Sequence, residues 1–156
     1  MAIGPKEGGR APNFSMDSTQ GPIKLADYKD QLLVLYFYPR DDTPGCTTEA
    51  KDFTALADEF EKAGAKIVGV SRDTMAKHEK FAAKHDLGVT LASDEDGKVC
   101  EAYGVWVEKK NYGKTYMGIE RSTFLIGPDK KVIRIWRKVR VKGHAEDVLN
   151  VIKSDA

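Results

Sequence analysis

Apolar positions along the chain fall into short continuous runs and into segments with helical spacing. The run Leu32–Tyr38 is rich in strand formers, as is typical of a central strand that is covered on both faces. From Pro44 or Cys46 to Lys62 the apolar residues recur at helical spacing, and Ala63-Gly64 ends this helix. Similar patterns predict further strands at 13–16, 23–25, 65–71, 89–92, 121–126 and 132–141, and helices at 74–85, 98–103 and 145–152.

The order of these elements predicts an α/β fold with a mixed sheet. Strands first alternate with helices, and the last two strands form a hairpin through the turn Gly127-Pro-Asp129 before a closing helix. The segment 107–118 carries glycine and lysine and is expected to be a loop. Because the chain has no internal repeat and no long linker, residues 1–156 are expected to form a single domain.

Composition and charge narrow the classes of function. The 156 residues are 41% hydrophobic and 31% charged, which is typical of a globular protein. A formal net charge of +1 provides no general attraction for nucleic acid or for an anionic membrane. The N-terminus lacks the apolar core of a signal peptide, and no apolar run approaches the roughly 20 residues of a membrane helix. We therefore expect a cytoplasmic protein.

Three further patterns do not support a binding site. The basic residues of the last predicted strand are interpreted as a solvated edge, because among them only Trp136 could stack on a base. His78 and His85 are seven residues apart, too far for a metal-binding pair one helical turn apart. The acidic segment 92–97 lacks the first and last ligands of a calcium loop. We expect no metal, no organic cofactor and no nucleic-acid partner.

The position of one cysteine indicates thiol chemistry. The two cysteines, Cys46 and Cys100, do not make a disulfide framework for a chain of this length. Cys46 follows a buried strand and stands in the first helical turn, where N–H groups and the helix dipole stabilise a thiolate. Thr43 can hydrogen-bond near the sulfur, and Pro44-Gly45 allows a tight turn. Alternatively, Cys46 is a small apolar residue of the core.

The residues around Cys46 resemble the active-site signature of peroxiredoxins, Pro-x-x-x-Thr-x-x-Cys. In this chain the signature consists of Pro39, Thr43 and Cys46. Ser-Asp-Glu-Asp at 93–96 and Gly-Ile-Glu-Arg-Ser-Thr-Phe at 118–124 are similar to the bacterioferritin-comigratory or Q-type group. The resemblance covers nearly the whole chain and implies a thioredoxin-like fold.

The resemblance also implies reduction of hydrogen peroxide and organic hydroperoxides. In that interpretation Cys46 attacks the terminal peroxide oxygen as a thiolate, Thr43 hydrogen-bonds the peroxide, and Pro39 shields the sulfur from water. Arg121 holds the thiolate and the polarised O–O bond, and Glu49 holds Arg121. Donors aimed at both ends of that bond stabilise the transition state more than the ground state. Alternatively, Arg121 is a solvated arginine at the end of a strand, and Glu49 is a carboxylate on the surface of a helix.

The resemblance leaves the recycling step open. Q-type enzymes carry a resolving cysteine either five residues after the first, where this chain has Lys51, or in the next helix, near Phe81–Ala83. Cys100 has the spacing of a buried core residue. We therefore expect a one-cysteine cycle in which an external thiol, thioredoxin or glutathione with glutaredoxin, resolves Cys46. Resemblance to the Q-type group also favours a monomer.

A redox-responsive sensor or holdase chaperone is the alternative function. Oxidation of Cys46 would then be a signal, and turnover would be incidental. A sensor needs a reactive thiol but not a complete pocket that polarises peroxide. The presence of Thr43 and Arg121 therefore favours the peroxidase.

Overall fold

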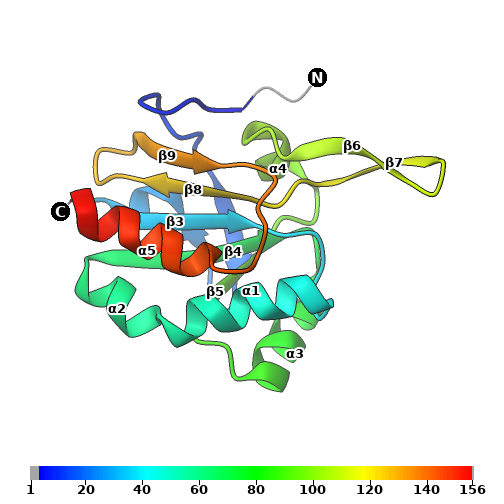
Figure 1. The fold of residues 1–156 in the computed structure, drawn as a ribbon, viewed down its shortest axis with the longest axis horizontal. Helices are drawn as coiled ribbons and strands as arrows, with labels where there is room; N and C mark the ends of the chain where they lie inside the picture. The colour runs from blue at the N-terminus through cyan, green and yellow to red at the C-terminus, as the bar shows by residue number, and fades with distance from the viewer. Residues whose placement is uncertain (1–3, 156) are drawn as a thin grey trace.

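Strand β3 (Leu32–Phe37) lies inside a mixed seven-stranded sheet in the computed structural model, which describes residues 4–155 (Figure 1). The strand order is β2-β1-β5-β4-β3-β8-β9. Because β3 pairs in parallel with β4 and antiparallel with β8, the sheet is mixed as the sequence predicts. The other strands of this sheet are β1 (Ser15–Ser18), β2 (Ile23–Lys24), β4 (Ala65–Ser71), β5 (Thr90–Ser93), β8 (Ser122–Ile126) and β9 (Val132–Trp136).

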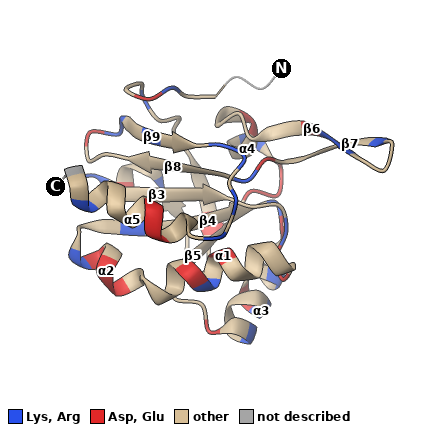
Figure 2. Cartoon of the chain, in the orientation of Figure 1, with Lys and Arg blue, Asp and Glu red and all other residues tan. Residues whose placement is uncertain are grey.

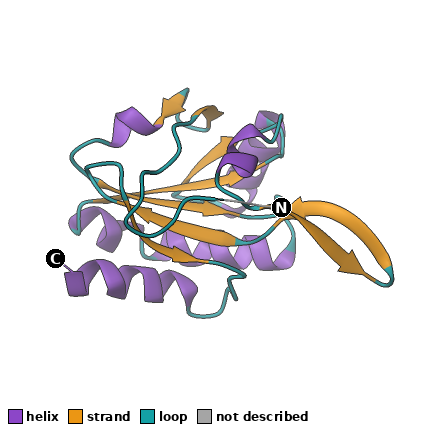
Figure 3. Cartoon of the chain, turned by 90° about the horizontal axis from the view of Figure 1, so that it is seen from above, coloured by secondary structure: helices purple, strands orange, loops and turns teal. Residues whose placement is uncertain are grey.

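Helices cover both faces of the sheet (Figure 3). Alternate side chains of β3 supply the two cores: Val34 and Tyr36 belong to one apolar cluster, and Leu33 and Leu35 belong to the other. The first cluster is covered by α1 (Pro44–Ala55), α2 (Ala57–Lys62), α3 (Met75–His85) and α5 (His144–Asp155), and the second by α4 (Lys98–Ala102) and the 3-10 helix η1 (Leu25–Tyr28).

The segment 107–118 forms a β-hairpin and not the expected loop. β6 (Trp106–Asn111) pairs antiparallel with β7 (Lys114–Ile119), and the hairpin extends away from the main sheet (Figure 1). Tyr112 and Gly113 both have positive φ, 52° and 78°, as a tight two-residue hairpin turn requires. The sequence prediction was wrong because most side chains of these strands are exposed, so no apolar face marks them.

The last strand is shorter than predicted. β9 ends at Trp136, and the predicted strand to residue 141 does not form. Lys138 adopts a left-handed φ of 48°, which interrupts an extended chain, and the N–H of Val139 donates to the carbonyl of Arg121. The basic residues that follow β9 therefore lie in the loop that leads to α5 (Figure 2).

The long helix predicted to end at Lys62 is divided into α1 and α2. Leu56 separates the two helices with φ −101° and ψ 3°, outside ordinary helical values. Across residues 4–155, each helix is too short or too polar to cross a bilayer.

Candidate active site

A short loop carries the chain from β3 to the first turn of α1. Asp42 has a φ of 60°, which turns the chain, and Thr43 is extended at the N-cap position. Pro44 is the first helical residue, where the missing N–H is not needed. Cys46 is thus the third residue of α1. Because the first turn of a helix leaves N–H groups without helical partners, a negative charge on the Cys46 sulfur is stabilised there.

Arg121 reaches the sulfur from the opposite side of the site. It directly precedes β8, the strand that pairs with β3. Its Nη2 group donates to the Sγ atom of Cys46 at 3.3 Å, and its Nη1 group donates to Oε1 of Glu49 at 2.7 Å. One guanidinium therefore bridges the thiol and the carboxylate. The alternative of a solvated arginine is wrong for this structure.

Glu49 is buried one helical turn after Cys46, with only 1% of its surface exposed. Among residues 4–155, no group forms a hydrogen bond with its Oε2 atom. Burial raises the pKa of Glu49 to about 7, although the adjacent Arg121 opposes the rise. Burial alone would lower the pKa of Arg121, but Glu49 and Cys46 raise it above its usual range. The guanidinium therefore stays charged beside the sulfur.

The structure brings all four predicted site residues to one cavity of about 520 Å³. Pro39, Thr43, Cys46 and Arg121 line it together. Cys46 itself is only 1% exposed, so the cavity gives access to a thiol that is otherwise covered. Such a cavity suits a small substrate that must approach one reactive atom.

The hydroxyl of Thr43 is hydrogen-bonded within the loop. Its Oγ1 atom donates to the carbonyl of Arg40 at 3.0 Å. The same residue also accepts the first helical hydrogen bond of α1 through its carbonyl, from the N–H of Thr47 at 2.8 Å. While it donates to Arg40, the hydroxyl oxygen can still accept a hydrogen bond from the peroxide O–H, whereas donation to the peroxide requires the Thr43 proton to turn away from Arg40.

The β6–β7 hairpin supplies the opposite wall of the cavity, which the sequence prediction missed. Trp106, Lys109, Tyr116 and Met117 line it. The Arg72 guanidinium lies 4.5 Å from the centre of the Trp106 ring and packs that indole at the cavity edge. The dipeptide Tyr112-Gly113, with a glycine in a two-residue turn, was the available signal for this hairpin.

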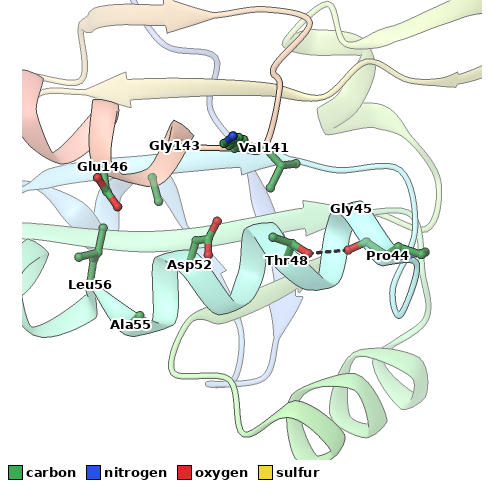
Figure 4. A pocket seen from close by; sticks show the side chains of 11 residues that line it. Pro44, Gly45, Thr48, Asp52, Ala55, Leu56, Val141, Gly143 and Glu146 are labelled. Carbon is green, nitrogen blue, oxygen red and sulfur yellow. Dashed lines mark hydrogen bonds between the residues drawn. The ribbon is translucent and has the colours of Figure 1, made fainter.

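A second hollow lies between α1 and the segment that enters α5 (Figure 4). Its volume is about 560 Å³. Asp52 and Glu146 line it, and burial, with a smaller effect of Glu146, raises the pKa of Asp52. Thr48 also lines it and donates its hydroxyl proton to the Pro44 carbonyl at 3.0 Å. Cysteine and histidine are absent among the described residues around this hollow, so the cavity at Cys46 is the candidate active site.

Cys100 lies on the other side of the sheet from Cys46. It belongs to the cluster that α4 covers, whereas Cys46 belongs to the cluster that α1 covers. Cys100 is fully buried, and its N–H donates to Oδ2 of Asp94 at 2.8 Å. Burial and the nearby Asp94 raise the pKa of the Cys100 thiol far above its usual range. The predicted burial of Cys100 is thus confirmed.

His78 and His85 do not approach each other as metal ligands. His78 contacts Asp41, and His85 contacts Asp42, both in the loop before α1. In the part of the chain that the structure describes, no three or more His, Cys, Asp or Glu residues are grouped as a metal site.

Comparison with known proteins identifies relatives over almost the whole chain. Residues 8–135 match the AhpC/TSA family. Peroxiredoxin Bcp of Bacillus subtilis is 50% identical over 147 residues, which are 94% of this chain and 94% of the relative.

Solved structures of similar proteins have the same architecture. A variant of PrxQ from Xylella fastidiosa superposes with a TM-score of 0.92 at 42% identity, over 97% of both chains. The Xanthomonas campestris bacterioferritin comigratory protein, studied for alkyl peroxide reduction, superposes with a TM-score of 0.86 at 48% identity, over 91% of both chains. These likenesses confirm the thioredoxin-like fold expected from the sequence.

Proposed function

The chain belongs to the AhpC/TSA family of peroxiredoxins, and on that premise we propose that it reduces hydrogen peroxide and organic hydroperoxides through Cys46. The observation that carries this proposal is the 3.3 Å contact between the Arg121 guanidinium and the Cys46 sulfur inside an accessible cavity. A fixed cation at that position stabilises both the thiolate and the negative charge that develops on the peroxide.

The attack is a two-electron displacement. The Cys46 thiolate attacks the terminal peroxide oxygen, an S–O bond forms, and the O–O bond breaks. The distal oxygen leaves with the bonding pair and takes a proton to become water or an alcohol. The sulfur is oxidised to sulfenic acid. Pro39 and the hairpin wall limit water at the sulfur, and Arg121 stabilises the departing charge.

An external thiol completes the cycle. It condenses with the Cys46 sulfenic acid to give a mixed disulfide and water, and a second thiol releases the reduced enzyme. Cys100 is buried on the opposite face of the sheet, and the two positions where Q-type enzymes place a resolving cysteine hold Lys51 and the segment 81–83. Thioredoxin, or glutathione with glutaredoxin, is the proposed reductant.

We also propose a domain organisation, an oligomeric state and a cellular location for this chain. We infer a single domain, because one sheet runs through the chain from β1 to β9. A cytoplasmic monomer is consistent with two free cysteines and with the resemblance to Q-type enzymes.

The test is peroxide consumption with dithiothreitol, thioredoxin or glutathione/glutaredoxin as reductant. Cys46→Ser is expected to abolish turnover with every reductant, and Cys100→Ser is expected to keep it. Undiminished turnover in Cys46→Ser would contradict the proposal. A sensor or holdase would instead show stoichiometric oxidation of Cys46 and no multiple turnover with any of the three reductants.

Arg121→Lys tests the observation that carries the proposal. Lysine keeps the charge but cannot hold Glu49 and the sulfur at once, so the rate constant for peroxide should fall by about 10- to 100-fold. Stopped-flow measurement of Cys46 oxidation gives this rate directly. Arg134→Lys is the matched control, because Arg134 lies on β9 and packs on Trp136 at 5.2 Å. An unchanged rate constant for Cys46 oxidation in Arg121→Lys would contradict the proposed role of Arg121.

A further inference from the structure

We propose that Asp41 and His78 form a buried positioning pair that holds the loop before Cys46 in the geometry needed for peroxide attack. This inference rests on the proposed function. The pair lies outside the cavity, and neither residue touches the sulfur in the structure. Its effect would be on where the loop places Thr43 and the start of α1.

The two side chains are buried and directly bonded. His78 of α3 is fully buried, and the side chain of Asp41 is 5% exposed. The Nδ1 atom of His78 lies 2.7 Å from Oδ2 of Asp41, and its Nε2 atom lies 2.9 Å from the carbonyl oxygen of Ala92 in β5. One imidazole thus connects the loop to a helix and to a strand of the sheet.

The hydrogen-bond partners determine how many protons the pair holds. A carbonyl oxygen only accepts, so Nε2 of His78 must carry a proton toward Ala92. The bond between Nδ1 and the Asp41 carboxyl needs one more proton, on either atom. With these two protons the pair is neutral overall, so no uncompensated charge is buried beneath the loop.

Asp41 is bound by further groups on its other sides. The Tyr38 hydroxyl donates to Oδ1 of Asp41 at 2.5 Å, and burial raises the pKa of that phenol well above its usual value, so it remains a donor. The backbone N–H of Asp41 donates to Oδ2 of Asp73 at 2.8 Å, and the Ser71 hydroxyl donates to the same oxygen at 2.7 Å. Tyr38 directly follows β3, and Asp73 lies in the short loop between β4 and α3, where Ser71 at the end of β4 holds its carboxylate.

The position of Asp41 in the chain explains why this matters for the reaction. Thr43 follows two residues later at the N-cap position of α1, and Cys46 follows in the first helical turn. Arg121, in contrast, is carried by β8. The relative placement of sulfur and guanidinium therefore depends on how firmly the loop is fixed to the sheet, and peroxide attack is sensitive to displacements of about 1 Å.

The neighbouring Asp42 provides a natural control. Its carboxylate accepts from Lys84 Nζ at 2.7 Å and from His85 Nε2 at 2.8 Å, so it also joins the loop to α3. These contacts are solvent-exposed, with 42% of the Asp42 side chain accessible, and exposed ion pairs contribute little to stability. Asp42→Asn keeps a residue that tolerates positive φ, and it removes the charge together with one of the two acceptor oxygens.

The experiment compares two reactions of Cys46 in the full-length protein. Oxidation by hydrogen peroxide needs the aligned site, whereas alkylation by iodoacetamide needs only an accessible thiolate. In Asp41→Ala the ratio of the peroxide rate constant to the alkylation rate constant should fall at least about 10-fold. In Asp42→Asn it should stay within about twofold of the parent value.

Asp41→Asn distinguishes the hydrogen bonds from the charge. Its Oδ1 can accept from Tyr38, and its Nδ2–H can donate to Nδ1 of His78, so every bond of the pair is kept. The ratio should therefore recover to within about threefold of the parent. An equal loss in Asp41→Asn and Asp41→Ala would overturn the claim that the bonds position the loop.

A second variant keeps the test possible in case Asp41→Ala does not fold. Should Asp41→Ala fail to fold, the double variant Asp41→Ala/His78→Leu, which has no unpaired buried charge, undergoes the same comparison. An unchanged ratio in the folded variant, with the parent reactive toward peroxide, overturns the positioning role alone. A parent protein that is inert to peroxide would overturn the proposed function and this inference with it.

Discussion

Glu49 has a carboxyl group whose charge changes near neutral pH. Burial raises its pKa from 4.5 to about 7, and its Oε2 atom has no hydrogen-bond partner in the described part of the chain. When ionised, it pairs with Arg121 at 2.7 Å and helps to fix the guanidinium beside Cys46. The ionised form is therefore useful for the reaction but unfavourable for the stability of the fold.

Glu49→Gln is expected to separate these two effects. Because the folded pKa lies above the unfolded one, the parent loses stability as pH rises from about 4.5 to 7, on the order of 3 kcal/mol if fully expressed. Glutamine does not titrate, so the variant should gain stability relative to the parent across that range. Urea unfolding at pH 4.5 and pH 8 measures the difference.

The same variant should react more slowly with peroxide. At pH 8 the amide holds Arg121 less firmly than the carboxylate does, and the rate constant for Cys46 oxidation should fall by about 10-fold. Glu61→Gln is the control, because Glu61 is an exposed carboxylate that pairs with Lys66 at 3.6 Å. A parallel pH dependence of stability in Glu49→Gln and the parent would refute the raised pKa.

Candidate site residues that one short motif carries could be placed together from the sequence. Pro39, Thr43 and Cys46 lie within eight consecutive positions, so local spacing was enough to place them at one loop. Arg121 and Glu49 came from the family resemblance. Trp106 and Lys109 were missed, because their contact with the cavity depends on how a hairpin folds back over the site and not on spacing.

At the scale of elements, the packing of the parallel strands β3 and β4 depends on one glycine, Gly69. Tyr36 and Gly69 are directly paired residues, and a Cβ atom at Gly69 would lie 2.6 Å from Cζ of the Tyr36 ring. That ring is buried and stacked on Phe53 of α1 at a centroid distance of 4.7 Å. It has little space in which to move, because the residues around it are also buried.

Gly69→Ala is therefore expected to destabilise the protein by about 2–4 kcal/mol through overpacking. The shift of Tyr36 would also press on α1, so peroxide reactivity should fall together with the midpoint of thermal unfolding. Gly88→Ala is the matched control, since its added Cβ would meet only the Thr54 methyl, at 3.3 Å. Equal stabilities for the two variants would contradict this packing argument.

Elements were predictable where an apolar face is buried. The strands at 32–38 and 65–71 and the helix at 74–85 match β3, β4 and α3 closely, because the core dictates their pattern. The β6–β7 hairpin has no such face, and within residues 4–155 its two strands pair in a sheet only with each other. Exposed pairing of this kind leaves little trace in hydrophobic periodicity.

At the scale of the whole molecule, the sheet separates the two sulfur atoms. Cys46 and Cys100 lie in the two clusters on its opposite faces, and both are buried. A disulfide requires Cα atoms within about 7 Å, so joining the two cysteines would require local unfolding of α1 or α4, the helices that carry them.

One equivalent of hydrogen peroxide should accordingly give a sulfenic acid at Cys46 and no internal disulfide. Mass spectrometry after trapping with dimedone is expected to find one adduct, at Cys46, in the parent and in Cys100→Ser. Cys46→Ser should give none. An oxidised parent that is two hydrogen atoms lighter and does not react with dimedone would indicate a disulfide between the two cysteines.

The separation of the two sulfur atoms also has a consequence for how Cys46 is inactivated by excess peroxide. In the proposed one-cysteine cycle the sulfenic acid waits for an outside thiol, so we expect its lifetime to follow the concentration of the available thiols. When peroxide exhausts those thiols, a second peroxide molecule converts the same sulfur to sulfinic acid, which thiols do not reverse. On this proposal the fraction of molecules carrying sulfinic acid increases with peroxide exposure and records the accumulated oxidative stress.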